Sequence, residues 1–151
     1  MTIHFICRGN SFRSFIAETY LRSLNLPNVK VISSGTVAAQ YKELNKEPHE
    51  IVLQVLNHHG LSKFAKPNYA DQLTDELLAA GDVTICMNDL VLSEASKFNL
   101  PADTIVWDIS DIGEKERKPS ATKTRTQLKE EAYQEITQKV DELVANLGLQ
   151  G

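Results

Sequence analysis

The sequence predicts a single α/β domain over residues 1–151, built in three layers from a four-stranded parallel sheet and helices on both of its faces. Two observations predict this fold class. Short apolar runs rich in β-branched residues alternate with longer segments of helical periodicity, which is the pattern of consecutive βαβ units. The first run leads directly into a short loop and then a helix, an order typical of a phosphate-binding loop after strand 1.

Four apolar runs are expected to form the strands. Each is short, rich in valine, isoleucine or threonine, and bounded by turn-forming or helical segments. In chain order they are Thr2–Ile6, Val29–Ile32, Val83–Met87 and Thr104–Trp107. The segment Ser33–Pro48 is expected to be a long loop over a ligand site, because ligands of open α/β sheets bind beyond the carboxyl ends of the strands.

Five segments are expected to form helices. Apolar residues recur in them at spacings of three and four, and Pro27 and Gly60 follow the first two as helix breakers. In chain order they are Ser14–Ser23, His49–His59, Thr74–Ala80, Asp89–Lys97 and one helix within Thr122–Leu149. The last helix is expected to bury an apolar stripe that consists of Ala132, Ile136, Val140, Leu143 and Leu147.

The composition argues against several classes of protein. With 42% hydrophobic and 24% charged residues, the chain is expected to be globular and not disordered. A net charge of −4 and a pI near 5.6 predict neither a nucleic-acid partner nor a membrane-binding surface. No apolar run approaches the ~20 residues that span a bilayer, and the N-terminus lacks the pattern of a signal peptide. We therefore expect a cytoplasmic protein, monomeric or weakly dimeric.

The residues that follow the first strand indicate an anion-binding loop around a nucleophilic thiol. Cys7 stands where unpaired backbone N–H groups and the positive end of a helix dipole converge, which favours a thiolate and a bound oxyanion. Arg13 can return its guanidinium to two oxygens of that anion. Gly9 permits a tight turn, Asn10 tolerates left-handed backbone angles, and the Ser14 hydroxyl can cap the helix or bind the sulfur.

At this loop the sequence resembles the low-molecular-weight protein tyrosine phosphatases, whose loop reads Cys-x-Gly-Asn-x-Cys-Arg-Ser. The matching residues are Cys7, Gly9, Asn10, Arg13 and Ser14. Supporting matches are Ala17-Glu18, Ser33–Thr36 and Trp107–Asp111. The resemblance implies a cysteine-dependent hydrolysis of phosphomonoesters, above all protein phosphotyrosine, through a cysteinyl-phosphate intermediate. It also implies that the reaction needs no metal or cofactor.

The resemblance implies a role for each residue around the loop. Backbone N–H groups of the loop would hold the phosphate, so its remaining members, Arg8, Ser11 and Phe12, are expected to bind substrate too. Ser33 matches a family serine that helps to hold the loop asparagine. Tyr41, in the long loop, is the candidate for an aromatic wall against the substrate ring.

A phosphatase of this type also needs a carboxylic acid, because a phenolic oxygen leaves poorly without a proton donor. Asp108 and Asp111 follow the fourth strand, on the edge of the sheet that carries Cys7. The family's acid stands in an Asp-Pro pair about four residues after an aromatic residue such as Trp107, and this spacing selects Asp111. Ile112 replaces the family's proline.

Other departures from the family bear on substrate and regulation. Phe12 replaces the second loop cysteine, which precludes an internal disulfide with Cys7. Ser11 stands where tyrosine-directed members commonly have isoleucine and phosphoarginine-directed members have threonine. The histidine that braces the loop in some members has no clear counterpart, and Asn68 is the nearest polar residue. His58 and His59 lack partners at metal-ligand spacing, so no metal site is assigned.

Three alternative functions remain open from the sequence. Phosphoarginine hydrolysis is suggested by Ser11. Arsenate reduction on the same scaffold would need an external thiol, because Cys86 alone cannot complete an internal relay. A non-catalytic module that binds phosphorylated ligands is suggested by Phe12 and Ile112, which depart from the family pattern.

Overall fold

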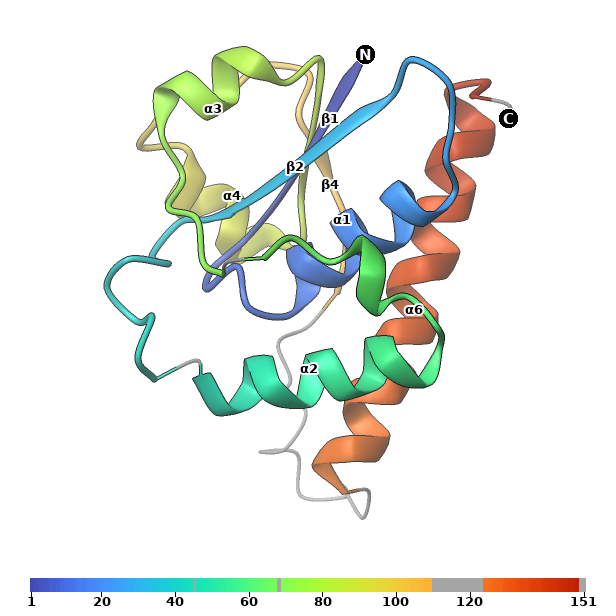
Figure 1. The fold of residues 1–151 in the computed structure, drawn as a ribbon. Helices are drawn as coiled ribbons and strands as arrows, with labels where there is room; N and C mark the ends of the chain where they lie inside the picture. Colours follow the sequence, from blue (N-terminus) through green and yellow to red (C-terminus); the bar gives the residue numbers. More distant parts are fainter. Residues whose placement is uncertain (45, 68, 110–123, 150–151) are drawn as a thin grey trace.

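The computed structural model describes residues 1–44, 46–67, 69–109 and 124–149 (Figure 1). The sheet has four parallel strands in the order β2-β1-β3-β4. They are β1 Thr2–Cys7, β2 Lys30–Gly35, β3 Val83–Cys86 and β4 Ile105–Val106. The four strands and their parallel arrangement confirm the predicted fold class.

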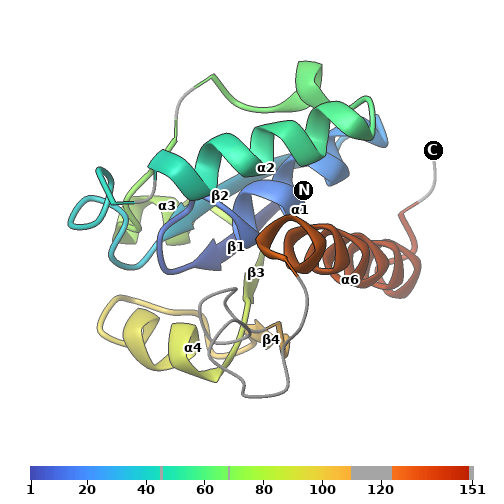
Figure 2. The same ribbon diagram turned by 90° about the horizontal axis from the view of Figure 1, so that it is seen from below.

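The helices of the described residues flank this sheet on both faces. They are α1 Arg13–Ser23, α2 Lys46–His58, α3 Asp75–Ala80, α4 Asp89–Ala95 and α6 Arg125–Asn146, with a short 3-10 helix η1 at Ser62–Phe64. Helices α1 and α6 pack together on one side and α2 lies against α6, whereas α4 lies on the other side beside β3 (Figure 2). None of the described helices is both long and apolar enough to cross a membrane.

The core forms where the sheet meets these two helical layers. Phe5 of β1 and Phe15 of α1 are fully buried, and Trp107 packs against Phe5 with ring centroids 5.6 Å apart. The apolar stripe of α6 faces the core as predicted, and its buried members include Ala132, Ile136, Val140 and Leu143. Burial of such side chains stabilises each by roughly 1.5–3 kcal/mol, which fixes α1 against the sheet.

Two strands extend beyond their predicted ends. β1 includes Cys7, and β2 continues from Ile32 to Gly35, so the long loop begins three residues later than predicted. The extension follows from strand pairing, because Cys7 lies opposite Gly35 in the register. A Cβ atom on Gly35 would lie only 2.4 Å from the Arg8 carbonyl oxygen, so this close approach requires glycine. Helix α2 also starts earlier, at Lys46 instead of His49.

His4 is a fully buried titratable residue at the centre of β1. Its Nε2 lies 2.7 Å from the Ser34 hydroxyl. Burial, followed by the positive charge of Lys66, lowers the pKa of His4 from 6.5 to about 4. The folded protein therefore keeps His4 neutral under mildly acidic conditions, in which an unfolded chain protonates it.

We expect this difference in pKa to make stability depend on pH. Between about pH 4 and 6.5 the unfolded chain binds more protons at His4 than the folded protein does. The contribution of neutral His4 to the free energy of unfolding is therefore complete above pH 6.5 and is lost as the pH falls towards 4. The loss is about 3 kcal/mol for a difference of this size. Urea unfolding at a series of pH values should show a flatter profile for His4→Asn than for wild type. His58→Gln, at an exposed site, is the control, and an unchanged slope in His4→Asn would contradict the assignment.

Candidate active site

The candidate site lies at the carboxyl end of β1, where the chain direction across the sheet changes. β1 pairs with β2 on one side and with β3 on the other, so the connections leave in opposite directions. Ligands of open α/β sheets bind at such a switch point. Residues 8–12 form the loop between β1 and α1 there, and no side chain caps the first turn of α1. The first N–H groups of α1 therefore adjoin the loop.

Cys7 is the last residue of β1, and its sulfur has two hydrogen-bond partners, one in the loop and one in the first turn of α1. The backbone N–H of Asn10 lies 3.2 Å from Cys7 Sγ, and the Ser14 hydroxyl lies 2.9 Å from it. Because Ser14 Oγ already accepts a bond from the Asn10 side chain, its own proton is available to the sulfur. Donors directed at a sulfur atom are the arrangement that stabilises a thiolate.

Asn10 holds the loop through every hydrogen-bonding position of its side chain. Its Nδ2 donates to the hydroxyls of Ser14 and Ser33, each at 2.8 Å. Its Oδ1 accepts from the backbone N–H of Asp71 at 2.9 Å and from Lys66 Nζ at 2.5 Å. These bonds stabilise a backbone with φ of +54°, which asparagine tolerates better than most residues.

Lys66 is a part of this network that the sequence did not reveal. Its amine donates to Asn10 Oδ1, to Ser33 Oγ at 3.1 Å and to Asp71 Oδ2 at 2.8 Å, which uses all three of its protons. Ser33 in turn donates to the buried carboxylate of Glu18 at 2.8 Å. The sequence offered no clear counterpart to the family's bracing histidine, and Asn68, the nearest polar residue, lies outside the described residues.

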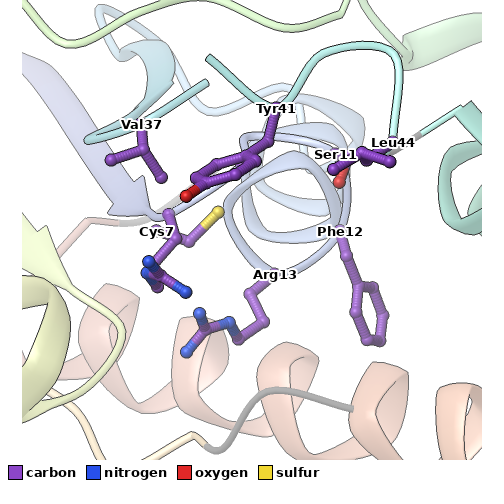
Figure 3. A pocket seen from close by; sticks show the side chains of 9 residues that line it. Cys7, Ser11, Phe12, Arg13, Val37, Tyr41 and Leu44 are labelled. Atoms are coloured by element: carbon purple, nitrogen blue, oxygen red, sulfur yellow. The ribbon is translucent and has the colours of Figure 1, made fainter. Parts of the chain in front are cut away.

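A pocket opens above the loop (Figure 3). Its lining comes from the loop and from the long loop after β2, and consists of Cys7, Arg8, Gly9, Ser11, Phe12, Arg13, Val37, Tyr41 and Leu44. Tyr41 and Val37 lie on one side of the cysteine and Arg13 on the other, and the hydroxyl end of Tyr41 is directed towards Cys7. The Phe12 ring points away from the sulfur. The pocket therefore combines a polar floor with apolar walls.

Arg13 connects this floor to the segment that follows β4. Its side chain is buried, and Nη1 donates to the carbonyl oxygen of Ile109 at 2.8 Å. This contact brings residue 109 beside the loop. Asp108 is exposed, and Asp111, the predicted acid, lies outside the described residues.

Arg8 links the loop to the opposite face of the sheet. Its Nε donates to both carboxylate oxygens of Glu94 on α4, at 3.1 and 3.2 Å. Glu94 also accepts the Thr36 hydroxyl at 2.7 Å, so one carboxylate joins the loop after β1 to the loop after β2. Glu94 had no recognisable signal in the sequence, because it stands in an ordinary amphipathic helix.

The remaining cysteine and histidines lie apart from the pocket. Cys86 is fully buried in β3, and burial raises the pKa of its thiol to about 12, so it remains a neutral thiol. His59 contacts Glu130 of α6 through Nε2 and stacks on Tyr133. In the described ranges, no group of three or more His, Cys, Asp or Glu side chains could hold a metal ion.

We expect Lys66→Met to weaken the fold and the anion site together. The variant loses hydrogen bonds from a charged donor, so the free energy of unfolding should fall by about 1.5–3 kcal/mol. Saturating inorganic phosphate should also raise the urea midpoint less than in wild type. Lys63→Met, an exposed lysine in η1, is the matched control. If both variants show the same midpoints, Lys66 does not support the loop.

Comparisons with known proteins agree with this geometry. A family model described as low molecular weight phosphotyrosine protein phosphatase matches residues 2–150. The pig (Sus scrofa) protein of that name is 31% identical over 100 residues, which cover 64% of this chain and 60% of the pig protein.

Solved structures show the same fold at lower identity. Wzb from Vibrio vulnificus, in complex with benzylphosphonate, has 20% identity and a TM-score of 0.73, over 96% of this chain and 97% of that chain. The YwlE arginine phosphatase from Geobacillus stearothermophilus has 21% identity and a TM-score of 0.66, over 97% and 92% of the two chains. Given the family match over nearly its whole length, the chain belongs to the low molecular weight phosphotyrosine protein phosphatase family.

Proposed function

We propose that the protein hydrolyses protein phosphotyrosine through a cysteinyl-phosphate intermediate, without a metal or cofactor. The observation that carries this proposal is the position of Cys7 Sγ, which receives hydrogen bonds from Asn10 and Ser14 on the floor of a pocket. A sulfur held in this way beside a buried arginine is suited to attack a phosphorus atom. Membership of the phosphatase family supports the same chemistry.

In the first step, the Cys7 thiolate attacks phosphorus, forming a sulfur–phosphorus bond while the bond to the tyrosine oxygen breaks. Arg13 and the loop N–H groups stabilise the negative charge on the three equatorial oxygens. Asp111 gives its proton to the departing tyrosine oxygen, which leaves as neutral tyrosine. The contact of Arg13 with the Ile109 carbonyl supports this role for Asp111, since it anchors the chain two residues earlier.

In the second step, the Asp111 carboxylate takes a proton from water, and the water oxygen attacks the phosphorus of the intermediate. The sulfur–phosphorus bond breaks, inorganic phosphate leaves, and the thiolate is restored. Asp111 ends the cycle protonated, ready for the next leaving group.

The walls of the pocket favour an aromatic substrate. Tyr41, Val37 and Leu44 offer an apolar surface against which a phenyl ring can pack. Among the described lining residues, Arg8 is paired with Glu94, whereas Arg13 bonds to a backbone carbonyl, so the positive charge of Arg13 disfavours the guanidinium of phosphoarginine.

Phosphoarginine remains the second candidate because of Ser11. This residue lines the pocket and is 5% exposed, so its small hydroxyl replaces the apolar wall that an isoleucine would provide. A hydroxyl at this position can hydrogen-bond a guanidinium group. Arsenate reduction gains no support, because Cys86 is buried in the sheet and outside the pocket.

The proposed partner is a phosphorylated protein or a small phosphomonoester, and the proposed compartment is the cytoplasm. A thiol nucleophile requires a reducing environment, and the sequence contains two cysteines, both unpaired. A monomer or weak dimer stays our prediction for the oligomeric state.

We expect wild-type protein to hydrolyse p-nitrophenyl phosphate at mildly acidic pH in the presence of a chelator, and Cys7→Ser to abolish turnover because the nucleophile is lost. Cys86→Ala is the matched control and should retain activity. Phosphotyrosine and phosphoarginine peptides, assayed in parallel by phosphate release, then decide the substrate class. A folded wild type without turnover would refute the enzymatic proposal and favour a module that binds phosphorylated ligands.

We expect Asp111→Asn to slow turnover by about 10²–10⁴-fold for phenyl phosphate, and by less for p-nitrophenyl phosphate, because the nitrophenolate needs less help from an acid. Asp108→Asn is the control, since Asp108 is the other carboxylate after β4. Rates for a series of substituted phenyl phosphates give the dependence on the leaving group. If Asp108→Asn shows the steeper dependence instead, the acid is Asp108.

A further inference from the structure

A column of two stacked rings connects two segments of the site. One is the loop between β1 and α1, residues 8–12, called the phosphate loop below; the other is the loop after β2, residues 36–44, called the rim. His49 of α2 is buried, and its ring stacks on Tyr69 with centroids 3.9 Å apart. The rings of His49 and Phe15 also pack in a T-shaped arrangement with centroids 4.6 Å apart, which fixes the column against α1. Neither His49 nor Tyr69 lines the pocket.

The inner end of this column contacts the phosphate loop. His49 Nδ1 lies 3.3 Å from the carbonyl oxygen of Ser11. Because a carbonyl oxygen only accepts, Nδ1 carries the proton and donates. Burial, and secondarily Lys66, lowers the pKa of His49, which keeps this ring in its neutral form. The bond orients the peptide group of Ser11, at the centre of the loop that would surround the phosphate.

The outer end of the column contacts the rim. The Tyr69 hydroxyl donates to the carbonyl oxygen of Lys42 at 3.1 Å. Lys42 lies between Tyr41 and Leu44, the two rim residues that form the outer wall of the pocket. Both of those side chains are carried by a segment of consecutive turns, in which no helix or strand fixes the backbone.

The earlier half of the rim segment is held by a different residue. Gln72 accepts a hydrogen bond from the Ala39 N–H and donates to the Thr36 carbonyl. The Val37 N–H also bonds to the Arg8 carbonyl. In the later half, which carries Tyr41 and Leu44, the Tyr41 N–H bonds to the Val37 carbonyl within the segment itself. The Tyr69 hydroxyl is a side-chain contact that connects this half to the segment before α3.

We propose that Tyr69 determines the selectivity of the pocket for an aromatic leaving group by holding the rim over the phosphate loop. This inference rests on the proposed function for the meaning of the pocket, and it assigns to Tyr69 a positioning role that requires no contact with substrate. The Tyr69 hydroxyl fixes the distance of Tyr41 and Leu44 from the phosphate loop, whereas His49 supports the phosphate loop itself through Ser11. The two ends of the column therefore have separable effects on ligand binding.

Binding of two anions by the full-length protein tests this division. Isothermal titration calorimetry would compare inorganic phosphate, which contacts only the loop, with benzylphosphonate, which also carries a ring. Tyr69→Phe keeps the stack and removes the hydroxyl, so it should weaken benzylphosphonate binding by about two- to tenfold and leave phosphate binding unchanged. Tyr20→Phe, which removes the hydroxyl bonded to Asp141 on the far helix, is the matched control.

His49→Phe examines the inner end of the column. It keeps a ring against Tyr69 but loses the bond to Ser11, so both anions should bind more weakly by a similar factor. Equal losses for both anions in Tyr69→Phe, or no loss for either, would overturn the proposal. A wild type that binds both anions without hydrolysing p-nitrophenyl phosphate would refute the proposed function and leave this test valid.

Discussion

The conformation of the phosphate loop depends on the four hydrogen bonds of the Asn10 side chain. They join the loop to three other parts of the chain: helix α1 through Ser14, strand β2 through Ser33, and the loop before α3 through Lys66 and Asp71. A fully used amide in a buried site leaves the backbone one arrangement, in this case one with positive φ. The Asn10 N–H is consequently directed at the Cys7 sulfur by the fold itself, and such preorganisation lowers the cost of forming an anion site.

The sequence predicted the contiguous part of the site, and the family resemblance added Ser33 and Tyr41, but other distant supporting residues were missed. Residues 7–14 are recognisable because strand, turn chemistry and helix start follow one another, and each step has a local signal. Lys66 and Glu94 have no such signal, since they stand 56 and 86 positions from the loop residues that they contact. Likewise, the polar run Ser33–Gly35 reads as a loop, and only its pairing with Cys7 makes it a strand.

Among the described residues, the supporting cations around the phosphate loop are paired with carboxylates, whereas Arg13 is not. Lys66, which does not line the pocket, lies 2.8 Å from Asp71 and 3.8 Å from Glu18, and Arg8, which does line it, is paired with Glu94. Arg13 is buried and bonds to a backbone carbonyl, and no carboxylate of the described residues forms an ion pair with it. The carboxylates thus neutralise the supporting cations, and Arg13 keeps a field that attracts a phosphate dianion.

The long reach of the Asn10 contacts also has a consequence for how the protein folds. Sequence separations of 56 and 61 residues divide Asn10 from Lys66 and Asp71, so these bonds form only after β2, α2 and the following loop have docked. In a nascent or partly folded chain, the strained backbone at Asn10 has nothing to stabilise it. The Cys7 thiol therefore gains its ordered surroundings only after the chain up to Asp71 has docked, and molecules without these contacts carry an ordinary cysteine.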